Sequence, residues 1–336
     1  MCPEDWCRFH IKHAKEKTMS AADEIFIKMC RDILENGTDT RGEKVRPHWE
    51  DGSPAYTIKK FGVVNRYDLR KEFPAITLRR TPIKSAVDEV LWIWQKKSNN
   101  VNDFGQHIWD AWADENGSIG KAYGYQMSLK QPYRDLKEEN ILEAFPGSSI
   151  SGIKIVSDSG RLIAEKAENG MWKMDQVDRV LYDLKINPYS RRILTGIYTQ
   201  ADLSEMNLYP CAYSMTFNVT KPEGSDKLVL NSILNQRSQD ILAANAWNVA
   251  QYAALTHMFA RCTGMEVGEF VHVIADAHIY DRHVPVIEEL IQREPHPAPK
   301  FRMNPEINDF YKFTKDDFSL DDYEFGPPVD KIPVAI

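Results

Sequence analysis

Cys211 is the residue whose type and setting best suit chemistry. It follows Pro210 directly, and the residues after it alternate between polar and apolar in the manner of a β-strand. A thiol at the head of a strand can be held rigidly at the edge of a pocket. It becomes a nucleophile when a neighbouring cation lowers its pKa from about 8.5. On the residues alone, Cys211 is either such a nucleophile or an ordinary unreactive cysteine.

Four arginines could supply that cation or bind a phosphate: Arg46, Arg191, Arg192 and Arg237. Each lies among polar residues at the expected end of an element. The planar guanidinium fork suits a phosphate dianion, which it can bind through two hydrogen bonds at once. The alternative is that these arginines form ordinary surface ion pairs.

A second group of polar rings lies between Asp276 and His283. His278, Tyr280 and His283 follow an apolar run. They could contact a ribose, bind a metal or be ordinary loop residues. No cysteine or glutamate lies at ligand spacing from them, so we expect no metal.

Apolar spacing predicts the helices that would position these residues. One helix runs from Ser20, its N-cap, to Gly37, where it stops. Others are predicted over about 83–97, 176–186 and 245–262, and the last is apolar on nearly every side. Cys30 and Cys262 fall within these helices, so both are expected in the core.

Strand patterns fill the later half of the chain. Residues 213–219 alternate, and a turn at 223–227 leads into 228–230, which predicts a hairpin. Residues 192–199 and 269–274 are further strand candidates. Because helices and strands mix without a regular βαβ alternation, the pattern favours an α+β fold.

Composition indicates a globular protein with an acidic balance. The 336 residues are 43% apolar, and the five cysteines include no C-x-x-C pair, so neither a disulfide framework nor a zinc site is predicted. The net charge of −7 makes nucleic acid an unlikely primary partner. No apolar run approaches the roughly 20 residues of a membrane span, and the first residues are charged, so we expect no membrane association and a cytoplasmic protein.

Two stretches differ from the rest of the chain. Residues 1–19 are charged and aperiodic, which predicts an N-terminal extension. Residues 128–174 contain turn clusters at 146–149 and 157–160 and are expected to be an insertion with a small hairpin between 152–156 and 161–164. Residues 20–336 are then expected to form a single catalytic domain that holds this insertion.

Several motifs, in order along the chain, are similar to those of thymidylate synthases. The segment Asn207–Tyr213 resembles the active-site segment of that family. The other matching motifs are Glu89–Trp92, Ile108–Gly117, Ala122–Gly124, Ser190–Arg192, Asn235–Asp240, Trp247–Ala250, Asp276–Tyr280 and Pro333–Ile336. The resemblance covers about 74–127 and 175–336 well, 20–73 loosely, and the N-terminal tail and the insertion not at all.

This resemblance implies a fold, a reaction and a dimer. The fold is α+β, with a curved mixed sheet covered by helices. The reaction is reductive methylation of dUMP to dTMP with 5,10-methylenetetrahydrofolate, giving dihydrofolate, and Cys211 would add to C6 of the uracil. The homodimer implied is one in which Arg191 and Arg192 reach the active site of the partner subunit.

Further roles carry over by motif position. Arg237 and Ser238 would bind the phosphate, and Arg237 would also favour the thiolate. Arg46 would complete the phosphate site from a mobile loop. Glu89 and Tyr123 resemble the acid and base residues of the family's water network, which move the protons that the covalent steps require.

The remaining roles concern the nucleoside and the folate. Asn248 would hydrogen-bond O4 and N3 of uracil, and His278 and Tyr280 the ribose hydroxyl. Asp240 would lie beside both the substrate and the pterin. Two tryptophans and the end of the chain would border the folate and exclude water: Trp109, Trp112, Ala335 and Ile336. For Trp112, core packing is an equal alternative to a folate contact.

Two departures and two alternatives accompany the resemblance. Ala212 follows the nucleophile where many members have histidine, and 243–246 replace a more usual Leu-Gly-Leu-Pro. One alternative is a dUMP hydroxymethylase, against which Trp109 and the intact tail argue through water exclusion; Asn248 favours uracil over cytosine. The other is a non-catalytic nucleotide- or RNA-binding relative, which would be expected to lose Cys211 or Glu89.

Overall fold

The structure is a computed structural model that describes residues 19–329 and 331–336. The predicted N-terminal extension, apart from Met19, therefore lies outside the described residues. Within the described part, strands form three separate sheets. The largest has seven strands and is mixed, since β10 and β12 run parallel while the other long neighbours run antiparallel.

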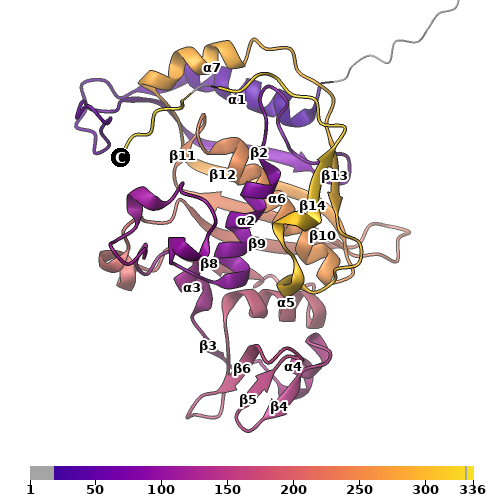
Figure 1. Ribbon diagram of the computed structural model, residues 1–336. Coiled ribbons are helices and arrows are strands. Elements are labelled where there is room, and N and C mark those ends of the chain that lie inside the picture. Colours follow the sequence, from indigo (N-terminus) through magenta and orange to yellow (C-terminus); the bar gives the residue numbers. More distant parts are fainter. Residues whose placement is uncertain (1–18, 330) are drawn as a thin grey trace, which may run out of the picture.

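The large sheet brings together segments from across the chain (Figure 1). Its order is β1 (Thr38–Asp39), β2 (Thr57–Asp68), β12 (Glu266–Tyr280), β10 (Val229–Gln236), β9 (Ala212–Thr220) and β8 (Leu194–Gly196), with β11 (Gln239–Asp240) beside β12. The registers shift between Leu230 and Ser232 and between Asn235 and Gln236. These bulges bend the central strands, and the second lies at the end of β10 next to Arg237.

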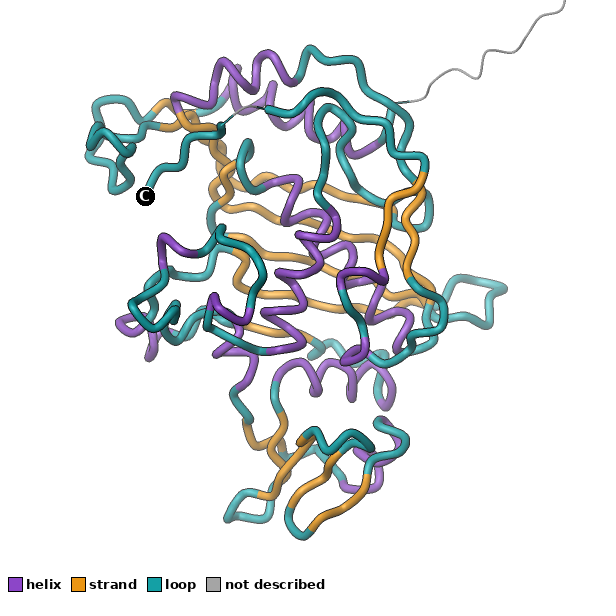
Figure 2. The backbone as a smooth tube through the Cα atoms, in the orientation of Figure 1, coloured by secondary structure: helices purple, strands orange, loops and turns teal. Residues whose placement is uncertain are grey.

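Helices cover one face of this sheet. Figure 2 shows α2 (Ile83–Leu91) and α6 (Asn245–Cys262) lying across the strands. The hydroxyls of Ser232 on β10 and Thr256 on α6 lie 2.7 Å apart and are buried. Because α6 lies between the sheet and α2, it is buried on nearly every side, as its apolar sequence predicts.

Further helices and strands surround the large sheet. Helices α1 (Ala21–Asn36) and α7 (Val284–Leu290) lie together beside β2 and β12 and form a second apolar cluster with them. Strands β13 (Lys300–Met303) and β14 (Phe318–Asp321) form a two-stranded sheet. No helix in the described ranges is long and apolar enough to cross a bilayer.

Residues 131–174 form a small sheet with its own core, set apart from the large sheet (Figure 1). Its order is β3 (Gln131–Tyr133), β7 (Trp172–Met174), β6 (Leu162–Lys166), β5 (Lys154–Val156) and β4 (Ser149–Ser151), with α4 (Glu138–Ala144) beside it. Helix α3 (Gly124–Ser128) precedes this module, and α5 (Gln176–Ile186) follows it. The predicted hairpin is present as β5 and β6.

Several predicted elements agree with the structure, and others need correction. Helices α1, α5 and α6 and the β9–β10 hairpin occur where the sequence predicts them. The helix predicted over 83–97 is α-helical only to Leu91 and continues as a π-helix from Trp92 to Lys96. Cys30 is fully buried, but Cys262 is only half-buried, because the last turn of α6 reaches the surface.

Candidate active site

Cys211 lies directly before β9, and Arg237 lies directly after β10, so the antiparallel pairing of these strands brings them together. The Arg237 backbone N–H donates to the Cys211 carbonyl at 2.9 Å. Its guanidinium donates to the carbonyls of Pro210 at 3.0 Å and Tyr209 at 2.7 Å. The Nη2 atom that donates to Tyr209 also lies 3.7 Å from the Cys211 sulfur. One backbone hydrogen bond and two guanidinium–carbonyl contacts therefore hold a positive charge beside the thiol.

The Cys211 side chain is half-buried, and desolvation is the largest influence on its ionisation. Desolvation raises the pKa of Cys211, while the Arg237 charge, a hydrogen bond with Tyr123 and the Arg46 charge oppose that rise. The cation that sequence analysis required is present, but in the chain alone it does not overcome the cost of a buried thiolate. Further positive charge or closer contact is needed before the thiolate dominates at neutral pH.

Tyr123 contacts the nucleophile from a strained backbone. Its hydroxyl accepts the Cys211 backbone N–H at 3.1 Å, and its φ of 44° with ψ of −105° is a conformation that L residues rarely adopt. A Cβ on the next residue, Gly124, would lie 2.0 Å from the Ser98 carbonyl oxygen. The Ala122–Gly124 motif thus needs glycine there to hold the tyrosine in this position.

Glu89 lies on α2 and is almost completely buried. Burial raises the pKa of Glu89 to about 7, although hydrogen bonds from Trp247 and Gln251 favour the ionised form. The Trp247 indole N–H donates to the carboxylate at 2.7 Å. A carboxyl with this pKa can hold or release a proton near neutral pH.

The two tryptophans of the Ile108–Gly117 motif lie beside Tyr123. The ring of Trp109 is buried and packs edge to face on Tyr123 at 4.9 Å and against Trp112 at 5.8 Å. Trp112 is half-buried. Trp109 therefore lies between Tyr123, whose hydroxyl contacts Cys211, and the partly exposed ring of Trp112.

Asn248 is surrounded by amides that the sequence did not single out. Its Oδ1 accepts hydrogen bonds from Gln236 at 3.1 Å and Gln239 at 3.2 Å, and its Nδ2 donates to Gln251 at 2.8 Å. Gln236 and Gln239 flank Arg237 and Ser238 and belong to the Asn235–Asp240 motif. Their residue type alone gave no signal that they hydrogen-bond the Asn248 amide.

The polar rings at the end of β12 face Asp240 on β11. His278 Nδ1 lies 2.9 Å from Asp276, and its ring contacts that of Tyr280 edge to face. Asp240 accepts the Ala243 backbone N–H at 3.0 Å and lies 3.4 Å from His283. Burial alone would raise the pKa of Asp240, but the contacts with His283 and Ala243 lower it overall. No group of three possible metal-binding side chains occurs among the described residues.

The end of the chain pairs with the loop that carries Arg46. The His48 and Ile336 backbones exchange hydrogen bonds at 2.9 and 3.0 Å, and His283 Nε2 donates to the Pro333 carbonyl at 2.8 Å. The Ile336 side chain is 58% exposed. A cavity of about 770 Å³ separates this tail from the segment around Trp49.

The arginines divide into two groups. Arg237 contacts the thiol, and the charge of Arg46 is near enough to lower the pKa of both Cys211 and Tyr280. Arg191 and Arg192 are exposed just before β8, and none of the contacts found among the described residues joins them to Cys211. Ser238 is half-buried between β10 and β11.

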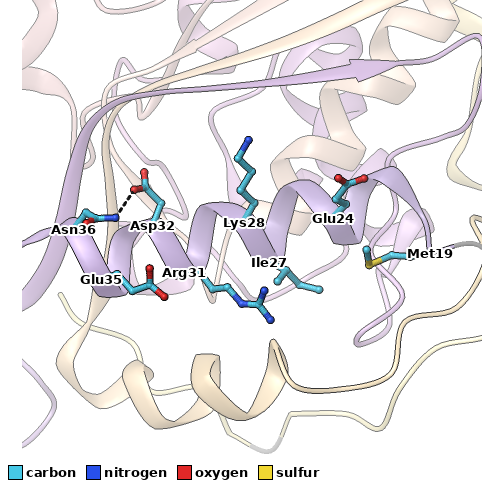
Figure 3. A pocket seen from close by; sticks show the side chains of 8 residues that line it. All are labelled: Met19, Glu24, Ile27, Lys28, Arg31, Asp32, Glu35 and Asn36. Carbon is cyan, nitrogen blue, oxygen red and sulfur yellow. Dashed lines mark hydrogen bonds between the residues drawn. The ribbon is translucent and has the colours of Figure 1, made fainter.

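Other hollows contain different chemistry. One of about 360 Å³ follows the outer face of α1 and is lined by side chains of both charges, namely Glu24, Lys28, Arg31, Asp32 and Glu35 (Figure 3). None of its lining residues belongs to the predicted site. The side chains that the sequence predicts to carry the chemistry gather where β9 begins and where β10 and β12 end.

This convergence defines the class of protein: an α+β protein in which a cysteine thiol and an arginine lie side by side, an arrangement typical of enzymes that act on anionic substrates. A family profile described as thymidylate synthase matches residues 24–336. Thymidylate synthases of Bacillus licheniformis and of Bacillus subtilis subsp. natto are 38% and 36% identical over 312 residues, which is 92% of this chain and 97% of each relative.

A solved structure agrees with these sequence matches. It is a thermostable thymidylate synthase A from Bacillus subtilis, 36% identical, with a TM-score of 0.76, over 94% of this chain and 99% of that one. The chain therefore belongs to the thymidylate synthase family and is an enzyme of the methyltransferase class.

Proposed function

We propose that the enzyme methylates dUMP to dTMP with 5,10-methylenetetrahydrofolate and releases dihydrofolate. The observation that supports this most directly is the Cys211 sulfur 3.7 Å from the Arg237 guanidinium, which is itself held by two carbonyl groups. The thiolate adds to C6 of the uracil, and C5 then attacks the methylene carbon of the folate. Loss of the C5 proton, hydride transfer from the reduced pterin and release of the sulfur complete the reaction.

The phosphate is bound by Arg237 and Ser238, with Arg46 from the 46–56 loop. Arg191 and Arg192 of the partner subunit supply the remaining positive charge in a homodimer. Two facts support the dimer: these two arginines are exposed in the single chain, and the uncovered side of the large sheet exposes apolar side chains, among them Phe61, Val64, Leu194 and Ile233. The added cations also provide the charge that Cys211 lacks in one chain.

The nucleoside is held at two places. Asn248 hydrogen-bonds O4 and N3 of the uracil, and His278 and Tyr280 hydrogen-bond the ribose hydroxyl. The orientation of the Asn248 amide by neighbouring glutamines and the edge-to-face contact of the two rings on β12 support these roles.

Glu89 and Tyr123 move protons. The pKa of Glu89, about 7, suits a group that both gives and takes a proton at neutral pH. Tyr123 contacts the Cys211 backbone, and burial raises the pKa of its phenol well above the usual value, so it acts as a neutral hydroxyl. It therefore orients the group that accepts the C5 proton rather than ionising itself.

The folate lies against Trp109 and Trp112, with Asp240 at the pterin and Ala335 and Ile336 over it. Asp240 has a lowered pKa and is thus ionised at neutral pH, which suits the N–H donors of a pterin. Closure of the tail excludes water from the methylene intermediate.

We also propose that 128–174 is an insertion that borders the folate side of a single catalytic domain. Its separate sheet and core support this. Deleting 128–174 should raise the KM for the folate in an enzyme that still folds. An unchanged KM would contradict the proposal.

The reaction is tested by incubating the protein with dUMP and methylenetetrahydrofolate, following dihydrofolate by absorbance and identifying the nucleotide by mass. The proposal predicts dihydrofolate and dTMP in equal amounts. Hydroxymethyl-dUMP with tetrahydrofolate would instead identify a dUMP hydroxymethylase. Binding of dUMP without either product would identify a non-catalytic relative.

A further inference from the structure

A buried histidine lies behind the amide cluster around Asn248. His272 is on β12 and is fully buried, with its Nε2 2.7 Å from Oε1 of Gln236 at the end of β10. Helix α6, which carries Asn248, covers these two parallel strands (Figure 1). His272 is therefore linked through one residue, Gln236, to Asn248, the side chain proposed to bind the uracil.

The proton on His272 has one favourable position. Burial lowers the pKa of His272 to about 3, so the ring is neutral and carries a single N–H. Its Nδ1 is buried and has no hydrogen-bond partner among the described residues. A proton on Nδ1 would leave a buried N–H unpaired, which is rarer and costlier than an unpaired acceptor. The N–H is therefore on Nε2 and donates to Gln236.

This donor fixes the direction of a chain of hydrogen bonds. Because the Gln236 carbonyl accepts from His272, its amino group faces Asn248 and donates to Oδ1 at 3.1 Å. The Asn248 amino group then donates to Gln251 at 2.8 Å, and Gln251 in turn hydrogen-bonds Glu89. If the Asn248 amide were turned over, its amino group would face the amino group of Gln236, and its carbonyl would face the carbonyl of Gln251.

The direction matters because the two faces of an amide suit different bases. An acceptor opposite N3–H and a donor opposite O4 match uracil, whereas the reverse order matches N3 and the 4-amino group of cytosine. We propose that His272 is a positioning residue which, through Gln236, fixes the donor and acceptor order of the Asn248 amide and so favours a uracil nucleotide over a cytosine nucleotide. The inference rests on the proposed role of Asn248 in binding the base.

The test compares the affinities for dUMP and dCMP without folate, by titration calorimetry on the full chain. The wild-type protein should bind dUMP at least about 100-fold more tightly, the factor for two mismatched hydrogen-bond positions. His272→Leu removes the donor and lets Gln236 turn, so the ratio of the two dissociation constants should fall by about 5- to 10-fold, the factor for one hydrogen bond.

Two further variants separate orientation from general loss of structure. His272→Gln restores a donor that can reach Gln236 and should recover part of the ratio. His257→Leu is the matched control. Like His272, His257 has one buried ring nitrogen without a partner among the described residues, here Nε2. It lies on α6, packs against Phe73 and Phe301, and is outside the amide chain. For this variant, the ratio of the dissociation constants for dCMP and dUMP should equal that of the wild type.

Three outcomes decide the matter. A ratio that falls in His272→Leu, recovers in His272→Gln and stays constant in His257→Leu supports the inference. A His272→Leu protein that binds both nucleotides more weakly by the same factor overturns it and leaves the proposed function intact. A wild-type protein that does not prefer dUMP overturns the proposed function and this inference with it.

Discussion

The two sides of the active site are built in opposite ways. The thiol side consists of Cys211, Arg237, Tyr123 and Glu89, which are held by strands and helices of the main core. The tail side consists of the 46–56 loop and residues 333–336, whose ends are joined by two backbone hydrogen bonds and one from His283. The groups proposed to form and break bonds thus lie within the main core, while the last four residues, proposed to cover the substrate, are joined to the rest of the chain mainly through His48 and His283.

This difference follows from what each side must do. A nucleophile and its proton carriers lose rate when they are misplaced by about 1 Å, so burial and strain are tolerated there. A cover must open for the substrate to enter, so its contacts must be weak enough to break. Changes on the thiol side should therefore affect chemistry or global stability, and changes on the tail side should affect substrate binding and closure more than the chemical step.

The largest effect is expected from Cys211→Ser. The weaker nucleophile should reduce the rate of dTMP formation by about 10⁴-fold or more, with binding of dUMP retained. The measurement is single-turnover product formation beside calorimetric binding. Cys262→Ala is the control, because that thiol lies at the far end of α6, and its rate should stay within about twofold. Comparable losses in both variants would contradict the assignment.

Glu89→Gln should change how stability depends on pH. The folded pKa of Glu89 is raised from 4.5 to about 7, so the folded protein keeps a proton that the unfolded chain has already lost. Wild-type stability is therefore highest below the unfolded pKa and falls as pH rises through the folded pKa. Relative to Glu89→Gln, its free energy of unfolding should fall by about 2.5 kcal/mol between about pH 5 and pH 8.

Urea unfolding of both proteins across this pH range measures that difference. Parallel curves for the wild type and Glu89→Gln would mean that the carboxyl is ionised throughout and does not hold a proton in the folded enzyme.

Removing Ile336 should slow turnover without affecting the thiol. The variant loses the two backbone hydrogen bonds with His48, and kcat should fall by about 30-fold, the factor for two neutral hydrogen bonds. Alkylation of Cys211 by iodoacetamide should proceed at the wild-type rate. Val334→Ala, which alters an exposed side chain beside the same backbone, should remain within about twofold in kcat. A changed alkylation rate would mean that the two sides are not independent.

The smallest effect is expected from Trp49→Phe. This change removes the hydrogen bond from the indole N–H to Asp281 at 3.1 Å, which steadies the loop that carries Arg46. The KM for dUMP should rise by about fivefold, with kcat nearly constant, because only one hydrogen bond is lost and it lies outside the chemistry. Steady-state kinetics measure both constants. A fall in kcat with constant KM would place Trp49 on the chemical side instead.

Sequence patterns located the helices better than the sheet. The α5 and α6 bounds follow from apolar spacing and from end signals such as Asn187 and Gly264. Strand β2 was not predicted, because Lys59, Lys60 and Gly62 interrupt its alternation and its partner β12 lies about 200 residues away in the sequence. The π-helix after Leu91 also gave no local signal.

The site shows a similar division. Cys211 and Arg237 could be named from motifs, but their 3.7 Å separation depends on the register of β9 and β10, which sequence does not specify. Gln251 and His272 were missed because their types are common in cores and their positions matter only in three dimensions. The raised pKa of Cys211 likewise follows from burial, which is a property of the folded chain.

The most direct test of covalent catalysis is to stop turnover with denaturant and map the enzyme's peptides by mass spectrometry. With dUMP and methylenetetrahydrofolate present, the peptide that contains Cys211 should carry the added mass of the nucleotide, alone or joined to the folate-derived carbon. Formation of dTMP with the nucleotide on another cysteine, or on none, would contradict the assignment of Cys211 as the nucleophile.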